Sequence, residues 1–176
     1  AGRRLVKECN ALGIMLDLSH LNEKGFDEVA ALSDAPLVAT HSNAHAITPS
    51  SRNLTDRQLA MIAERRGMVG LNFATVFLRE DGKRGAEIGW EPLLRHLDHL
   101  IDCLGEDHVG FGSDFDWAMV PQGVGDAAGL PRLVAACLLG LAVWTAIAAW
   151  RGGFPPRPAQ RPAPVLWIVA GLSAQM

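Results

Sequence analysis

The stretch PLVATHSN, residues 36–43, sets the pattern from which the fold is predicted. It places an apolar run directly before three polar side chains, His41, Ser42 and Asn43. Continuous apolar runs of this length are typical of strands buried on both faces of a parallel sheet. The same order recurs in IMLDLSH (14–20), MVGLNF (68–73) and VGFGSDFD (109–116). The sequence therefore predicts four strands, at 14–18, 36–40, 68–73 and 109–113.

Segments with helical periodicity separate these runs, and we expect helices at 22–33, 55–66 and 90–104. Thr55 and Gln58 have the spacing of a capping box. Gly67 and Gly105 follow the last helical turns, where a glycine commonly ends a helix. The resulting βαβαβαβ order predicts parallel strands joined by right-handed crossovers.

Length, charge and cysteine content narrow the functional classes. The 176 residues suffice for one domain, and 20% charged with 49% hydrophobic residues indicates a globular chain. The formal net charge is −3, and no basic stripe suggests nucleic-acid binding. Three widely spaced cysteines form no CxxC pair and no even-numbered disulfide framework. We therefore expect a reducing, cytoplasmic compartment.

The character of the chain changes after residue 132. Residues 133–150 carry no charge, and a Pro-, Arg- and Gly-rich stretch follows them. An uncharged run of this length is at the short end of the range for a membrane helix, and a buried core helix is an equal alternative. The prediction is the C-terminal half of an α/β barrel over 1–132 and a divergent hydrophobic and Pro-rich tail over 133–176. Membrane association through 133–150 is the alternative localisation.

Polar side chains follow the predicted strands, with His20, His41 and Asp114 among them. In a parallel barrel these strand ends meet at one rim, where barrel enzymes hold their active sites. Two histidines on adjacent strand ends can share a metal, and imidazole nitrogen binds zinc at about 2.0–2.1 Å. The plainer alternative is that both are rim histidines bonded to backbone.

Taken together, the motifs resemble those of the membrane (renal) dipeptidase family of zinc metallopeptidases. The resemblance covers roughly residues 3–136 and keeps the family's order and spacing. It rests on the segments DLSH (17–20), THSNA (40–44), SRNLTD (51–56), HLDH (96–99) and DHVGFGSDFD (107–116).

This resemblance implies an α/β fold, a partial (β/α)₈ TIM barrel made of about the last four βα units. It implies hydrolysis of dipeptides by metal-activated water at two zinc ions. His20 and His41 match the histidines that bind the second zinc, and Arg52 matches the arginine that holds the substrate carboxylate. Asp114 matches the acid/base that handles the proton. A planar guanidinium suits a carboxylate because it can bind it bidentately.

The match to the family is incomplete. The family's HxD motif and bridging glutamate precede the part represented here, and Trp117 stands where glycine is usual. The sequence leaves open a catalytically incomplete fragment, or another barrel metallohydrolase of the amidohydrolase type. We expect a homo-oligomer or a complementing N-terminal half as partner. His96 and His99, three residues apart on a predicted helix, are expected to brace the fold or face solvent.

Overall fold

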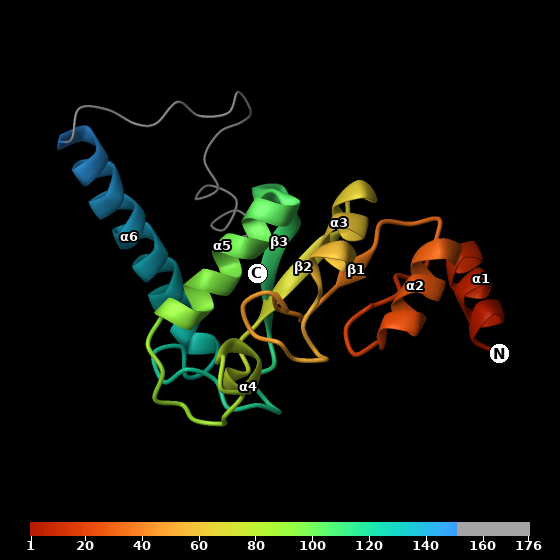
Figure 1. Ribbon diagram of the computed structural model, residues 1–176, viewed down its shortest axis with the longest axis horizontal. Coiled ribbons are helices and arrows are strands. Elements are labelled where there is room, and N and C mark those ends of the chain that lie inside the picture. Colours follow the sequence, from red (N-terminus) through yellow and green to blue (C-terminus); the bar gives the residue numbers. More distant parts are fainter. Residues whose placement is uncertain (151–176) are drawn as a thin grey trace. The chain divides into compact units, whose positions relative to one another are not determined.

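The structure is a computed structural model that describes residues 1–150 (Figure 1). The Pro-rich part of the predicted tail, at 151–176, lies outside the described residues. The chain divides into two compact units, residues 1–122 and residues 123–176. All four proposed site residues belong to the first unit.

The first unit alternates helices with short strands. Its elements are α1 (Gly2–Leu12), α2 (Glu23–Leu32), β1 (Val38–Ala39), α3 (Asp56–Glu64), β2 (Met68–Asn72), α4 (Thr75–Leu78), α5 (Glu91–Leu104), η1 (Glu106–His108) and β3 (Val109–Ser113). The described part of the second unit holds η2 (Ala127–Gly129) and α6 (Leu130–Trp150). No helix among the described residues is long and apolar enough to cross a membrane.

The three strands form one parallel sheet in the order β1-β2-β3. This confirms the mixed α/β class and the parallel pairing. The predicted strand at 14–18 is wrong: only Asp17 pairs, through a single parallel bridge to Val38. The physical reason is that the backbone at the start of this segment caps α1, because the Ile14 N–H donates to the Cys9 carbonyl at 2.9 Å. Ile14 and Met15 are half exposed, so no core fixes them as a strand.

The three predicted helices correspond to α2, α3 and α5. The capping box of α3 is present, with Thr55 accepting from the Gln58 N–H and the Gln58 side chain accepting from the Thr55 N–H. The predicted role of Gly67 is wrong, because Arg66 takes the left-handed position after α3, at a φ of 53°. Gly67 is needed for close approach instead: a Cβ there would lie 1.8 Å from the Leu37 carbonyl oxygen.

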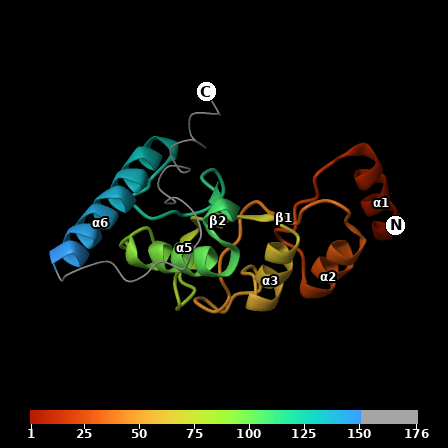
Figure 2. The same cartoon turned by 90° about the horizontal axis from the view of Figure 1, so that it is seen from above.

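The core lies where α5 packs against β2, β3 and α3. Figure 2 shows α1 and α2 side by side, consistent with their contacts. The central side chains are fully buried: Leu59, Ile62, Val69, Leu71, Leu93 and Leu100. This packed support holds the carboxyl ends of β1, β2 and β3, from which the polar side chains emerge.

Candidate metal and substrate site

His20 follows the bridge at Asp17 in a strained backbone conformation. Its φ is 71°, in the left-handed region that non-glycine residues rarely adopt. The preceding turn is fixed because Leu18 donates its N–H to the Val38 carbonyl at 2.8 Å, and Ser19 donates its N–H to Asp17 Oδ1 at 3.0 Å. Strain of this kind clusters at functional sites, where surrounding structure holds it.

His41 follows β1, and its position close to β2 and β3 depends on two glycines, Gly70 and Gly112. A Cβ at Gly70 would lie 1.9 Å from the Thr40 carbonyl oxygen, and one at Gly112 would lie 2.2 Å from the same atom. The Gly112 Cβ would also come within 2.8 Å of the His41 Cα. The chain after β1 can therefore lie close to β2 and β3 only because both positions lack a side chain.

The structure brings the two histidines together. His20 Nε2 lies 2.8 Å from His41 Nε2, and the ring centroids are 4.9 Å apart. The two predicted metal ligands thus direct equivalent nitrogen atoms at each other across the gap between two chain segments.

A hydrogen-bonded chain assigns the tautomer of His41. The Thr40 hydroxyl donates to Asp17 Oδ2 at 2.5 Å, so its oxygen accepts from the His41 Nδ1–H at 2.7 Å. Burial raises the pKa of Asp17, but hydrogen bonds from Thr40 and Ser19 outweigh it and lower the pKa overall. Asp17 is therefore a carboxylate that accepts, and His41 Nε2 carries a free lone pair.

Arg52 assigns the state of His20 in the same way. Its Nη2 lies 3.0 Å from His20 Nε2, and a guanidinium can only donate. Burial, together with the charge of Arg52 and the nearby His41, lowers the pKa of His20 and favours its neutral form. The His20 Nε2 lone pair, which accepts from Arg52 here, and the His41 Nε2 lone pair lie on atoms 2.8 Å apart, which suits a cation that takes the place of the Arg52 hydrogen bond. Tetrahedral zinc would separate its two nitrogen ligands by about 3.3 Å, a small outward adjustment.

Arg52 itself is held in a loop with buried neighbours. Asn53 donates from Nδ2 to the Thr48 and Phe77 carbonyls at 2.9 and 3.0 Å. The guanidinium carbon lies 5.2 Å from the centroid of the Phe77 ring. Burial lowers the pKa of Arg52, although the charge of Asp114 opposes this. Among the described residues, no group accepts a hydrogen bond from the buried Arg52 Nη1. A buried donor left unpaired is costly, so this atom favours an anionic ligand.

Asp114 comes directly after β3, where the pairing with β2 is irregular. The register shifts between Leu71 and Asn72, and Ser113 and Asp114 both have positive φ, at 45° and 61°. Bulges of this kind re-aim side chains beside active sites. Asn72 Nδ2 donates to Asp114 Oδ2 at 2.7 Å, which fixes the carboxylate near Arg52 and His20.

The sequence did not reveal the roles of the amides that support these groups. Buried Asn43 accepts from the Asn72 N–H at 2.9 Å and donates to the Asn72 carbonyl at 3.0 Å. Asn72 in turn reaches Asp114. The signal was present, since an asparagine stands shortly after the first run and within the second, but the pairing depends on the register of β1 and β2.

Three other residues, His96, His108 and Trp117, lie outside the histidine pair. His96 is fully buried and braces the loop that follows His41, accepting from the Ala44 N–H at 3.1 Å. His108 Nδ1 lies 2.7 Å from the Gly67 carbonyl oxygen, between β3 and the start of β2. Trp117 is 94% exposed.

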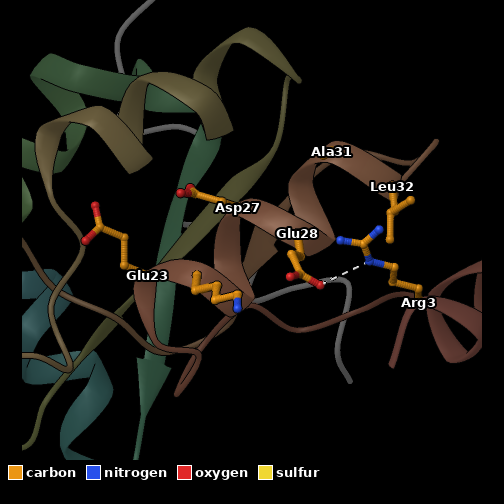
Figure 3. A pocket seen from close by; sticks show the side chains of 7 residues that line it. Arg3, Glu23, Asp27, Glu28, Ala31 and Leu32 are labelled. Atoms are coloured by element: carbon orange, nitrogen blue, oxygen red, sulfur yellow. Dashed lines mark hydrogen bonds and ion pairs between the residues drawn. The ribbon is translucent and has the colours of Figure 1, made fainter. Parts of the chain in front are cut away.

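A separate hollow of about 520 Å³ lies on the surface beside α1 and α2 (Figure 3). Its charges partly neutralise one another, because Arg3 Nε donates to Glu28 Oε2 at 3.4 Å. Its lining contains no histidine, and neither Arg52 nor Asp114 belongs to it. The hollow therefore lacks the imidazole ligands that the histidine pair offers to a metal. It is lined by Arg3, Glu23, Lys24, Asp27, Glu28, Ala31 and Leu32.

Comparison with known proteins identifies the family of the chain. The sequence model of one family, described as membrane dipeptidase (peptidase family M19), matches residues 1–147. An uncharacterized protein in the pqqA 5′ region of Klebsiella pneumoniae is 52% identical over 134 residues, covering 76% of this chain and 49% of that protein.

Two solved structures are each 79% identical, with a TM-score of 0.78 over 79% of this chain. One is dipeptidase AC, a metallo peptidase of family M19, and the chain covers 41% of it. The other is a metallo peptidase from Rhodobacter sphaeroides liganded with a phosphinate mimic of the dipeptide L-Ala-D-Ala, of which the chain covers 40%. The chain therefore spans about half, or less, of the length of these relatives.

Proposed function

Because the chain belongs to the membrane dipeptidase family (peptidase family M19), we propose that it carries part of a zinc site that hydrolyses dipeptides. The observation that carries this proposal is Arg52, which donates to His20 and keeps a buried, unpaired Nη1 within the described residues. A cation-binding histidine pair beside an unsatisfied guanidinium suits a substrate with a carbonyl and a free carboxylate.

Each residue has a distinct role in this proposal. His20 and His41 would hold zinc, which when bound polarises the peptide carbonyl and lowers the pKa of the attacking water. Arg52 binds the terminal carboxylate of the dipeptide through its planar fork. Asp114 accepts the proton of the attacking water and passes it to the leaving amine. Asn72 occupies Asp114 Oδ2, which leaves Oδ1 for that transfer.

The relative from Rhodobacter sphaeroides supports the substrate class, since its structure contains a phosphinate mimic of L-Ala-D-Ala. We propose that a dipeptide lies with its carboxylate on Arg52 and its peptide bond near His20 and His41. The guanidinium distinguishes this reading from another amidohydrolase-type barrel enzyme, whose substrate needs no carboxylate anchor.

We propose that the described residues form part of a (β/α)₈ barrel that requires further strands. The exposed edge supports this: Ile14 and Met15 are 52% and 57% exposed, next to the residue that pairs with β1. A nearby hollow of about 320 Å³ is lined by these two residues, Cys9, Pro36 and Val38 among others. The remaining strands and metal ligands would come from the same polypeptide, a second copy or a complementing N-terminal half.

The test is metal content and hydrolysis of L-Ala-D-Ala by the purified chain with added Zn²⁺. It is done alone and with the N-terminal part of the Rhodobacter sphaeroides relative. We expect Zn²⁺ binding that is lost in His41→Ala, and turnover in the mixture that is lost in Asp114→Asn. Turnover of a dipeptide amide as fast as the free dipeptide would overturn the role of Arg52. Zn²⁺ binding without turnover in any mixture would favour a metal-binding remnant.

A further inference from the structure

A second group of side chains that can ligate a metal comes from helices α3 and α5 and shares no residue with the histidine pair. His99 Nε2 is 2.8 Å from Asp56 Oδ1, and Cys103 Sγ is 3.6 Å from the same His99 nitrogen. One ligand atom from each residue lies within 4.8 Å of the other two. Asp56 opens α3, whereas His99 and Cys103 come from α5.

The fold brings these three residues together for reasons that do not depend on the active site. His99 and Cys103 are four residues apart on α5, so they share one helical face. The packing of α3 against α5 then presents the first residue of α3 to that face. The His99 and Asp56 side chains are 24% and 63% exposed, so an ion from solvent can reach them.

Two of the three ligand separations are close to those around a tetrahedral ion of the size of zinc, and the third, between Asp56 and Cys103, is within 4.8 Å. With zinc bonds of about 2.0 Å to nitrogen or oxygen and 2.3 Å to sulfur, tetrahedral ligands lie about 3.6 Å apart for nitrogen and sulfur. The Cys103 to His99 separation of 3.6 Å already has this value. Asp56 must move outward by about half an ångström to reach the corresponding nitrogen–oxygen separation, which its exposed position on the first turn of α3 allows.

We propose that Asp56, His99 and Cys103 form a zinc site on the surface of the α3–α5 pair, with water completing the coordination. A thiolate, an imidazole and a carboxylate are a donor set that favours Zn²⁺ over Mg²⁺ or Ca²⁺. On binding, the Cys103 thiol loses its proton to solvent. The His99 proton moves from Nε2 to Nδ1, so that neutral imidazole ligates.

The simpler role of these residues is a hydrogen bond between His99 and Asp56 beside an unreactive thiol. Burial and the charges of Asp56 and Asp102 raise the pKa of Cys103, which keeps the thiol protonated when no metal is bound. The two readings differ in what Cys103 does when a divalent metal is added. Only the zinc site converts it to a bound thiolate.

The test is a Co²⁺ titration of the full chain under reducing conditions, followed in the near ultraviolet, and then displacement by Zn²⁺. We expect a thiolate-to-cobalt charge-transfer band that saturates at one metal per chain. Since outer-shell changes alone weaken metal binding by about 10–100-fold, loss of the thiolate in Cys103→Ser should weaken Zn²⁺ binding by about 100-fold or more. Asp56→Asn should weaken it less.

Two variants separate this site from other metal binding. Cys137→Ser, the matched control, should keep the band, since Cys137 belongs to α6 in the other unit. His41→Ala should keep the band while losing metal at the histidine pair. Absence of the band in the unsubstituted chain, or its persistence in Cys103→Ser, would overturn the proposal. Circular dichroism confirms that each variant is folded.

Discussion

Replacing His96 tests whether one buried histidine links the stability of the chain to pH. His96 lies on α5 with no exposed surface. Its Nδ1 accepts the Ala44 N–H at 3.1 Å, while its Nε2 lies near Thr48 Oγ1 at 3.2 Å and the Leu78 carbonyl oxygen at 3.3 Å. Protonating Nδ1 would place the new Nδ1–H against the Ala44 N–H, so the hydrogen bond would be lost. Ala44 is three residues beyond His41.

The size of the effect follows from the pKa of His96. Burial lowers this pKa from 6.5 to about 4, against the opposing hydrogen bond to Leu78. The folded state therefore binds fewer protons than the unfolded state between these values, so stability falls as pH falls. The contribution is complete above pH 6.5 and is lost toward pH 4. At about 1.4 kcal/mol per pH unit, the full loss is about 3 kcal/mol.

The assay is urea unfolding followed by circular dichroism between pH 4.5 and 7.5. We expect His96→Asn to be less stable at pH 7.5, because the smaller side chain leaves a cavity. The amide oxygen of the substituted side chain can still accept from the Ala44 N–H. Because an amide does not titrate, the slope of the free energy of unfolding against pH should become shallower. Ile62→Val, a buried change that costs about 1 kcal/mol, is the control that should keep the original slope. An unchanged slope in His96→Asn would refute the assignment of a depressed pKa to this histidine.

Three further changes probe the site. Thr40→Val interrupts the hydrogen bonds from Asp17 to His41 and should weaken Zn²⁺ binding by about 10–100-fold in a metal titration, whereas Thr40→Ser should retain it. Gly112→Ala places a Cβ against the Thr40 carbonyl, so thermal unfolding should show a loss of at least about 2 kcal/mol, and a stable variant would contradict the close approach. Arg52→Lys keeps the charge but loses the planar fork, so in complemented enzyme KM for a dipeptide should rise by about tenfold or more, with little change for a dipeptide amide.

Most of the sheet and its helices could be predicted because their signals are local. The runs at 68–73 and 109–113 are apolar except for Asn72 and Ser113, and the structure buries or half-buries nearly all of their residues, in β2, Phe73 and β3. The capping box at Thr55 is likewise a property of neighbouring residues. The segment 14–18 has the same composition as a strand, but its backbone bonds to the end of α1 and its partner on one side is absent from the described sheet. The composition of a segment does not show whether its backbone will bond to a strand or to the end of a helix.

The proximity of His20 and His41 could be anticipated from the rule that parallel strands share one carboxyl edge, whereas the place of Arg52 followed only from the family resemblance. The hydrogen bonds that fix these residues could not be predicted from the sequence. In the sequence Thr40 is only the last residue of an apolar run, yet its hydroxyl links Asp17 to His41 by hydrogen bonds. Asn72 is one more strand residue in sequence, yet it fixes Asp114. Each link joins residues at least 20 positions apart, or depends on a rotamer, and neither is encoded in spacing.

Backbone strain gives an argument for function that is independent of any relative. Among the described residues, His20, Arg66, Ser113 and Asp114 are the non-glycine residues with positive φ. Three of these four belong to the two segments that carry the proposed ligand and proton-transfer group. Each such conformation costs about 1–3 kcal/mol unless other contacts hold it. Packing alone would favour relaxed turns at these strand ends. The strained turns occur together with the Asn72 and Thr40 hydrogen bonds, so this part of the fold fixes the positions of His20 and Asp114 at a cost to the stability of the turns.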